Sequence, residues 1–165
     1  MKNVLYKAAS WFAVIGGLLA LLIAVVTIVN VTAFGLDKIA RLFDANFPAI
    51  IGYEDFVSMI VSSAALMFFP YCQAHRGHVA VDVFIKMFPD GFARAIDVVS
   101  SILMTGLALF LGYMMVNGLI EVRGDNTLSA ILGWPIWPFY VPGIISMFLW
   151  AAIAGGQIFE READV

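Results

Sequence analysis

Four long apolar runs alternate with short polar stretches along the chain. No charged residue occurs from Ala8 to Leu36, and further uncharged runs cover residues 56–74, 98–120 and 126–159. About 20 apolar residues suffice for a helix to cross a bilayer. The pattern therefore predicts an all-α integral membrane fold, with four spans at approximately residues 11–34, 51–74, 92–120 and 135–159. Spans of about 24 residues reach roughly 36 Å and exceed the hydrocarbon core, so we expect them to tilt.

The composition agrees with this class of protein. Of the 165 residues, 62% are hydrophobic and only 13% are charged, whereas a soluble domain carries about 25% charged residues. The polar surface is too small to cover a water-soluble globule, so we expect residues 1–165 to form a single four-span membrane domain. The nine lysines and arginines are scattered without a basic patch, which argues against nucleic acid as a partner.

Small residues and prolines mark further features of the spans. Gly16, Ala20 and Ala24 lie on one helix face, which is compatible either with close helix packing or with ordinary membrane composition. Pro70 predicts a kink or a local break near the end of the second span. Pro142-Gly143 predicts an interruption in the fourth span.

The connections between spans carry most of the remaining charge. We expect residues 37–54 to connect the first two spans through a short surface helix, and Glu121 to Asn126 to form a compact turn. Glu54 and Asp55 fall at the start of the second span, where the helix dipole favours acids. The alternative for Glu54 is burial against a partner or another helix, which would make it functional.

The most polar stretch lies in the middle of the chain, between the second and third spans. His78, Asp82 and Lys86 recur at four-residue spacing, so on a helix they form one polar stripe on an apolar cylinder. Residues 75–90 are too apolar for a free loop and too short to span, and we expect an amphipathic interfacial segment there. Arg76 and Arg94 extend this charged region. Its side chains either pair with a partner subunit or with each other, or contact lipid headgroups.

The distribution of basic residues predicts the orientation in the membrane. With four spans, the N-terminus, the 75–90 segment and the C-terminal tail share one side. That side holds six of the nine lysines and arginines, and the other side holds three. Because basic residues are enriched in cytoplasmic loops, we expect both termini to lie in the cytoplasm.

No constellation of residues indicates catalysis or a bound cofactor. The only histidines, His75 and His78, lie three residues apart at one helix end, and no third imidazole exists to oppose them across a haem. No phosphate-binding loop, catalytic triad or metal-ligand spacing is present. The spans also lack a ladder of ionisable residues of the kind that an independent ion transporter uses. We expect no enzymatic activity, no metal, no cofactor and no transport by this chain alone.

The central segment carries a family resemblance. Arg76-Gly77-His78-Val79-Ala80-Val81-Asp82-Val83, placed between the second and third of four spans, resembles the signature of the small membrane subunit of TRAP transporters, the DctQ type. The acid Glu54 at the start of the second span, Pro135-Ile136-Trp137 before the fourth span and the later Pro142-Gly143 also match that family's pattern. The resemblance covers nearly the whole chain in length and topology.

The resemblance implies a non-catalytic subunit of a sodium-coupled importer of organic acids in the bacterial inner membrane. In that family a large elevator-type permease holds the substrate and sodium sites, a periplasmic solute-binding protein delivers the solute, and the small subunit acts as a scaffold. Since the chain ends at Val165, we expect the permease to be a separate chain. The candidate structural or partner-contact residues are Glu54, Arg76, His78, Asp82, Lys86 and Arg94. Two alternatives remain at this point: a haem- or quinone-binding membrane anchor of a redox enzyme, and an autonomous small channel.

Overall fold

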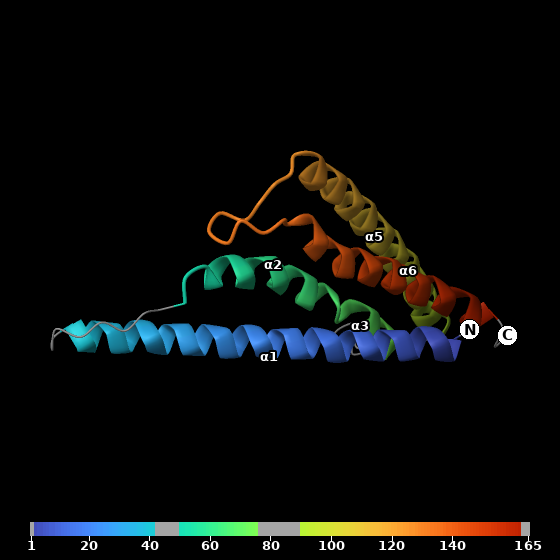
Figure 1. Ribbon diagram of the computed structural model, residues 1–165. Coiled ribbons are helices and arrows are strands. Elements are labelled where there is room, and N and C mark those ends of the chain that lie inside the picture. Colours follow the sequence, from blue (N-terminus) through green and yellow to red (C-terminus); the bar gives the residue numbers. More distant parts are fainter. Residues whose placement is uncertain (1, 42–49, 76–89, 163–165) are drawn as a thin grey trace.

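The chain forms a small bundle of long helices in a computed structural model that describes residues 2–41, 50–75 and 90–162 (Figure 1). The elements in order are α1 (Lys2–Ala40), α2 (Tyr53–Leu66), α3 (Phe69–Ala74), α5 (Asp90–Gly124), the 3₁₀ helix η2 (Trp137–Phe139) and α6 (Tyr140–Glu162). Four stretches of helix within these residues are long and apolar enough to cross a membrane: 3–40, 53–74, 98–124 and 137–158. The prediction of an all-α membrane fold with four spans is confirmed.

The first helix is longer than the sequence pattern predicted. α1 has 39 residues, which corresponds to a length of about 58 Å. The separate surface helix predicted after the first span is wrong for residues 37–40, because these residues continue α1 without a break. The Arg41 side chain lies 2.8 Å from the carboxylate of Asp37, one turn away, and such a pair supports the last turn of a helix.

The second span is divided, as Pro70 predicted. α2 ends at Leu66 and α3 begins at Phe69. Across the junction the N–H of Phe68 donates to the carbonyl of Ala65, a tight three-residue hydrogen bond. Pro70 lies in the first turn of α3, where a missing N–H costs nothing within the new helix. The proline therefore starts a second helix rather than bending one.

The third and fourth spans are joined by an excursion, residues 125–136, that folds back on itself. α5 continues through Gly124, so the turn predicted for residues 121–126 is confined to its last residues, where Asn126 has a φ of 49°. Leu128 and Pro135 then pair in an isolated antiparallel bridge. The interruption predicted at Pro142-Gly143 is wrong: α6 runs unbroken from Tyr140. Pro142 falls in the first turn of α6, where its missing N–H leaves no helical hydrogen bond unmade.

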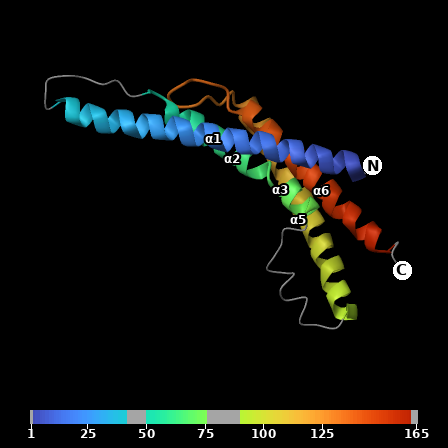
Figure 2. The same cartoon turned by 90° about the horizontal axis from the view of Figure 1, so that it is seen from below.

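The helices pack in the order α1, α2 with α3, α6 and α5 (Figures 1 and 2). A cluster of buried apolar residues lies between α5 and α6 and consists of Ala108, Met147, Trp150 and Ala151. On the opposite side, α1 approaches the end of α2 at the buried Gly16, where an added Cβ would lie 3.0 Å from Ala64 O. The close-packing interpretation thus holds for Gly16, whereas Ala20 and Ala24 are exposed.

Candidate functional site

The structure describes two of the six residues predicted to make structural or partner contacts. Glu54 is exposed in the first turn of α2. Arg94 lies in α5, which begins at the opposite end of the bundle from α2 (Figure 1), so these two residues do not share a site. Arg76, His78, Asp82 and Lys86 lie outside the described residues, as does most of the predicted interfacial segment. Their roles stay predictions.

A hydrogen bond from α6 satisfies a carbonyl group that the break in the second span leaves without its helical donor. In a continuous helix, the N–H of residue 70 would donate to the carbonyl of residue 66. Pro70 has no N–H, and the carbonyl oxygen of Leu66 instead accepts the hydroxyl of Ser146 at 2.7 Å. Ser146 is fully buried. A side chain of the fourth span therefore supplies the donor that the second span lacks.

A buried amide pair joins the same two spans near their other ends. Gln73 Nε2 donates to Gln157 Oε1 at 2.8 Å, and Gln157 Nε2 donates to the backbone carbonyl of Gln73 at 2.9 Å. Trp150 Nε1 donates to Gln73 Oε1 at 3.2 Å. The Trp150 ring also stacks on Phe69, with ring centroids 4.9 Å apart. Each buried amide thus finds partners, which matters because an unpaired amide in hydrocarbon is costly.

A third contact completes a line of hydrogen bonds along the two spans. The hydroxyl of Ser63 in α2 donates to the carbonyl of Phe139, directly before α6. We call these contacts, from Ser63–Phe139 through Leu66–Ser146 to Gln73–Gln157, the polar seam. Their residue numbers rise together on both sides, so the second and fourth spans run parallel. Helices associate weakly in lipid without such hydrogen bonds and close packing, and the polar seam therefore fixes α6 against α2 and α3.

A carboxylate at the opposite end holds the excursion between α5 and α6. Asp55 Oδ2 accepts the backbone N–H groups of Ile131 at 2.6 Å and Leu132 at 3.0 Å. Gly52, with a φ of 82°, lies beneath the same excursion, and a Cβ there would come within 2.6 Å of Leu132. Of the two adjacent acids, Asp55 therefore has the structural role within this chain, whereas Glu54 stays exposed.

Another buried amide links the first span to the start of the second. Asn30 is fully buried in α1, and its Oδ1 accepts the N–H of Ile50 at 2.8 Å. Asn30, Gln73 and Gln157 are not among the contact residues predicted from the sequence. A signal existed, since uncharged amides are infrequent inside apolar spans and usually find a hydrogen-bond partner there. The partners themselves follow only from the packing of the helices.

Among the residues whose side-chain burial is described, no charged side chain is buried, and the buried polar residues are Asn30, Ser63, Gln73, Ser146 and Gln157. No group of three or more potential metal ligands occurs in this part of the chain either. His75 is exposed at the end of α3, with its ring 4.3 Å from that of Tyr71. The buried polar side chains described in the spans therefore serve hydrogen bonding between segments of the chain.

These features define a multi-pass helical membrane protein in which buried polar side chains join the spans by hydrogen bonds. The family of tripartite ATP-independent periplasmic transporters, DctQ component, matches residues 31–163. The chain belongs to this family, and the predicted resemblance is confirmed. Comparison with curated proteins and with solved structures gives no match. The family supplies the small membrane subunit of TRAP transporters, which works with a large permease subunit and a solute-binding protein.

Proposed function

We propose that this subunit is a scaffold for the large, elevator-type permease of a sodium-coupled TRAP transporter that imports an organic acid. In this proposal the chain is one four-span domain of the bacterial inner membrane. It takes no part in catalysis and binds neither the solute nor sodium. The permease carries those sites, and a periplasmic solute-binding protein delivers the solute.

The observation that carries the proposal is that buried polar groups of the second and fourth spans hydrogen-bond to one another. Transporters bind ions and solutes at helix breaks, where free carbonyl groups act as ligands. The break between α2 and α3 exposes one such group, the carbonyl of Leu66, but Ser146 occupies it. The amides of Gln73 and Gln157 are likewise paired with each other. Groups that bind one another in this way support a rigid unit better than a transport path.

The outer faces of α1 and α5 support a role in assembly. Large apolar side chains are exposed along nearly the whole of α1, from Val4 at 69% to Ile39 at 57%, and again on α5, as at Leu103 and Phe110. In a bilayer these faces contact either lipid or another membrane subunit. Since members of this family work with a permease of the same membrane, we propose that part of this surface contacts the permease.

The proposed orientation places both termini in the cytoplasm. α1 begins and α6 ends at the same end of the bundle (Figures 1 and 2), as four spans require. The cytoplasmic assignment rests on the excess of lysine and arginine at this end, six of nine. Cysteine labelling of substituted residues near each end, in intact and in permeabilised cells, tests it: labelling of the N-terminal end in intact cells would contradict the assignment.

Co-purification tests the scaffold proposal. A tagged chain, expressed with its neighbouring genes and extracted in mild detergent, is expected to retain a large multi-span permease in a fixed ratio. A matched control carries the same tag on an unrelated four-span protein. Recovery of this chain without any large permease would contradict the proposal. A haem absorption band in the purified protein would instead support the redox-anchor alternative, which the family assignment does not favour.

A further inference from the structure

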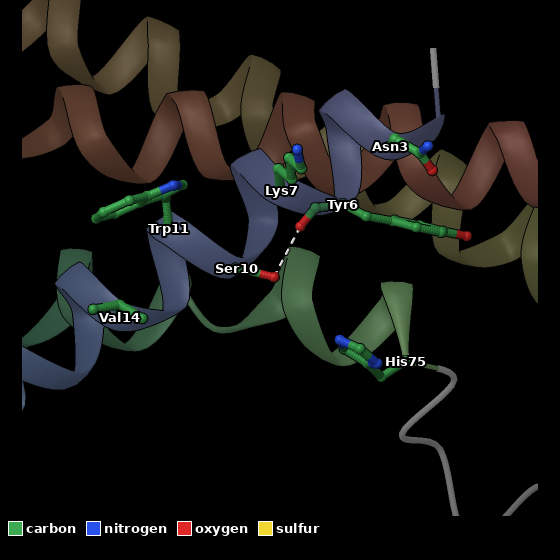
Figure 3. A pocket seen from close by; sticks show the side chains of 7 residues that line it. All are labelled: Asn3, Tyr6, Lys7, Ser10, Trp11, Val14 and His75. Carbon is green, nitrogen blue, oxygen red and sulfur yellow. Dashed lines mark hydrogen bonds between the residues drawn. The ribbon is translucent and has the colours of Figure 1, made fainter.

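A hollow of about 470 Å³ lies between the start of α1 and the end of α3 (Figure 3). Its volume falls in the range of about 300–1,000 Å³ that is typical of small-molecule sites. Tyr6, Lys7, Trp11 and Val14 line it from successive turns of α1, and His75 lines it from the end of α3. It is separate from the polar seam, and the scaffold proposal makes no use of it.

The lining changes in character along α1. Of three lining residues on one face of α1, Lys7 comes first, Trp11 follows one turn later, and Val14 lies about 10 Å beyond Lys7 along the helix axis. A cation, an indole and an aliphatic side chain thus succeed one another. A phospholipid has the same order, from a charged headgroup through the glycerol region to the acyl chains, and tryptophan prefers the intermediate level.

The cation in this hollow has no counter-charge in the described part of the chain. Lys7 is exposed and forms no ion pair there. Of the lining hydroxyl groups, that of Ser10 is already used, because it donates to the carbonyl of Tyr6 at 3.0 Å. Trp11 and Val14 are 68% and 54% exposed, so the apolar floor is also uncovered. An occupant that combines an anion with a hydrocarbon portion satisfies both requirements.

We propose that this hollow is a binding site for an anionic phospholipid. Its phosphate contacts Lys7, and its glycerol and upper acyl region cover Trp11 and Val14. The inference depends on the membrane location of the chain and not on the scaffold proposal. An acidic side chain of a partner protein would match Lys7 alone, but it would leave Trp11 and Val14 uncovered, and the apolar floor therefore favours lipid.

Native mass spectrometry of the full chain in detergent tests the site, with phosphatidylglycerol and phosphatidylcholine supplied in equal amounts. The wild-type chain is expected to retain phosphatidylglycerol about fivefold more than phosphatidylcholine, since one lysine near a membrane surface contributes about 1 kcal/mol. Lys7→Gln is expected to remove this preference and Lys7→Arg to keep it. Lys38→Gln is the matched control, because Lys38 lies at the other end of the same helix.

Three results would overturn the proposal. The first is an unchanged lipid preference in Lys7→Gln, with the variant folded as judged by helical circular dichroism. The second is full displacement of the lipid by millimolar inorganic phosphate, which would make the site one for a free anion. The third is protection of Lys7 from acetylation by the co-purified permease but not by phosphatidylglycerol vesicles, which would assign the hollow to the partner.

Discussion

The Ser146 hydroxyl lies 2.7 Å from the carbonyl oxygen of Leu66, the group that Pro70 leaves without its helical donor. This relationship connects a local property of one residue with the assembly of the whole bundle. A proline in the second span creates a free acceptor, and a serine in the fourth span satisfies it. The two parallel spans are then positioned for the contacts between Gln73 and Gln157. These contacts lie nearer the end that we propose to be cytoplasmic.

The first prediction concerns this hydrogen bond. Ser146→Ala is expected to lower the free energy of unfolding, measured by titration with SDS, by about 1 kcal/mol, a typical value for a hydrogen bond between membrane helices. In a Pro70→Ala background the backbone N–H of residue 70 becomes available to Leu66. The cost of Ser146→Ala should therefore fall to less than half in that background. An equal cost in both backgrounds would show that Ser146 does not replace the missing donor.

The amide pair supports a second prediction. Gln73→Leu or Gln157→Leu alone leaves polar groups buried without partners, whereas the double substitution removes both side-chain amides. The destabilisation of the double variant should thus be smaller than the sum of the single variants by about 0.5 kcal/mol or more, the coupling expected of residues in contact. SDS titration of all four proteins gives this value. Strict additivity would mean that the two amides do not depend on each other.

Close approach of α1 to the second span gives a third prediction. A Cβ at Gly16 would lie 3.0 Å from both Ala64 O and Met67 Cβ, whereas one at Gly17 would meet nothing within 4 Å. Gly16→Val is therefore expected to destabilise the protein by about 1–3 kcal/mol through overpacking. Gly17→Val, on the same helix, controls for the change in residue type. Similar thermal unfolding of the two variants would contradict the packing of α1 described above.

A fourth prediction separates the two adjacent acids of α2. Asp55→Ala removes the acceptor for two backbone N–H groups of the excursion before α6. Hydrogen exchange of residues 128–134 should accelerate, while exchange in the α3–α6 contact stays unchanged. Glu54→Ala is the matched control and should leave exchange at both places as in the wild type. Accelerated exchange in the Glu54 variant would indicate that the exposed acid also holds the excursion.

The sequence predicted the parts of the fold that depend on composition and on local geometry. The apolar runs gave four spans because their length matches a bilayer, and Pro70 gave the break because its ring lacks an N–H. The same reasoning gave a wrong prediction for Pro142. The effect of a proline depends on its distance from the start of the helix, and α6 begins only two residues before Pro142. The start of α6 depends on the excursion before it, and Asp55 holds that excursion from a distant part of the chain.

The site was harder to predict than the fold. The charged residues from Arg76 to Lys86 were predicted as contact residues because charges are rare in this apolar sequence. Of the six candidates, the structure describes Glu54 and Arg94, and the other four lie outside the described residues. The contacts that join the spans involve serines and glutamines, and a glutamine in an apolar span indicates that a hydrogen bond exists but not which residue is its partner. Their pairing depends on the three-dimensional register of α6 against α2 and α3, and a single sequence does not reveal that register.

One measurement tests the central claim most directly: uptake of the organic acid that stabilises the cognate binding protein, into liposomes with an inward sodium gradient. Liposomes are prepared with this chain alone, with the permease alone and with both, each with the binding protein outside. We predict no uptake above empty liposomes for this chain alone and sodium-dependent uptake when both subunits are present. Sodium-dependent uptake by this chain without the permease would contradict the account.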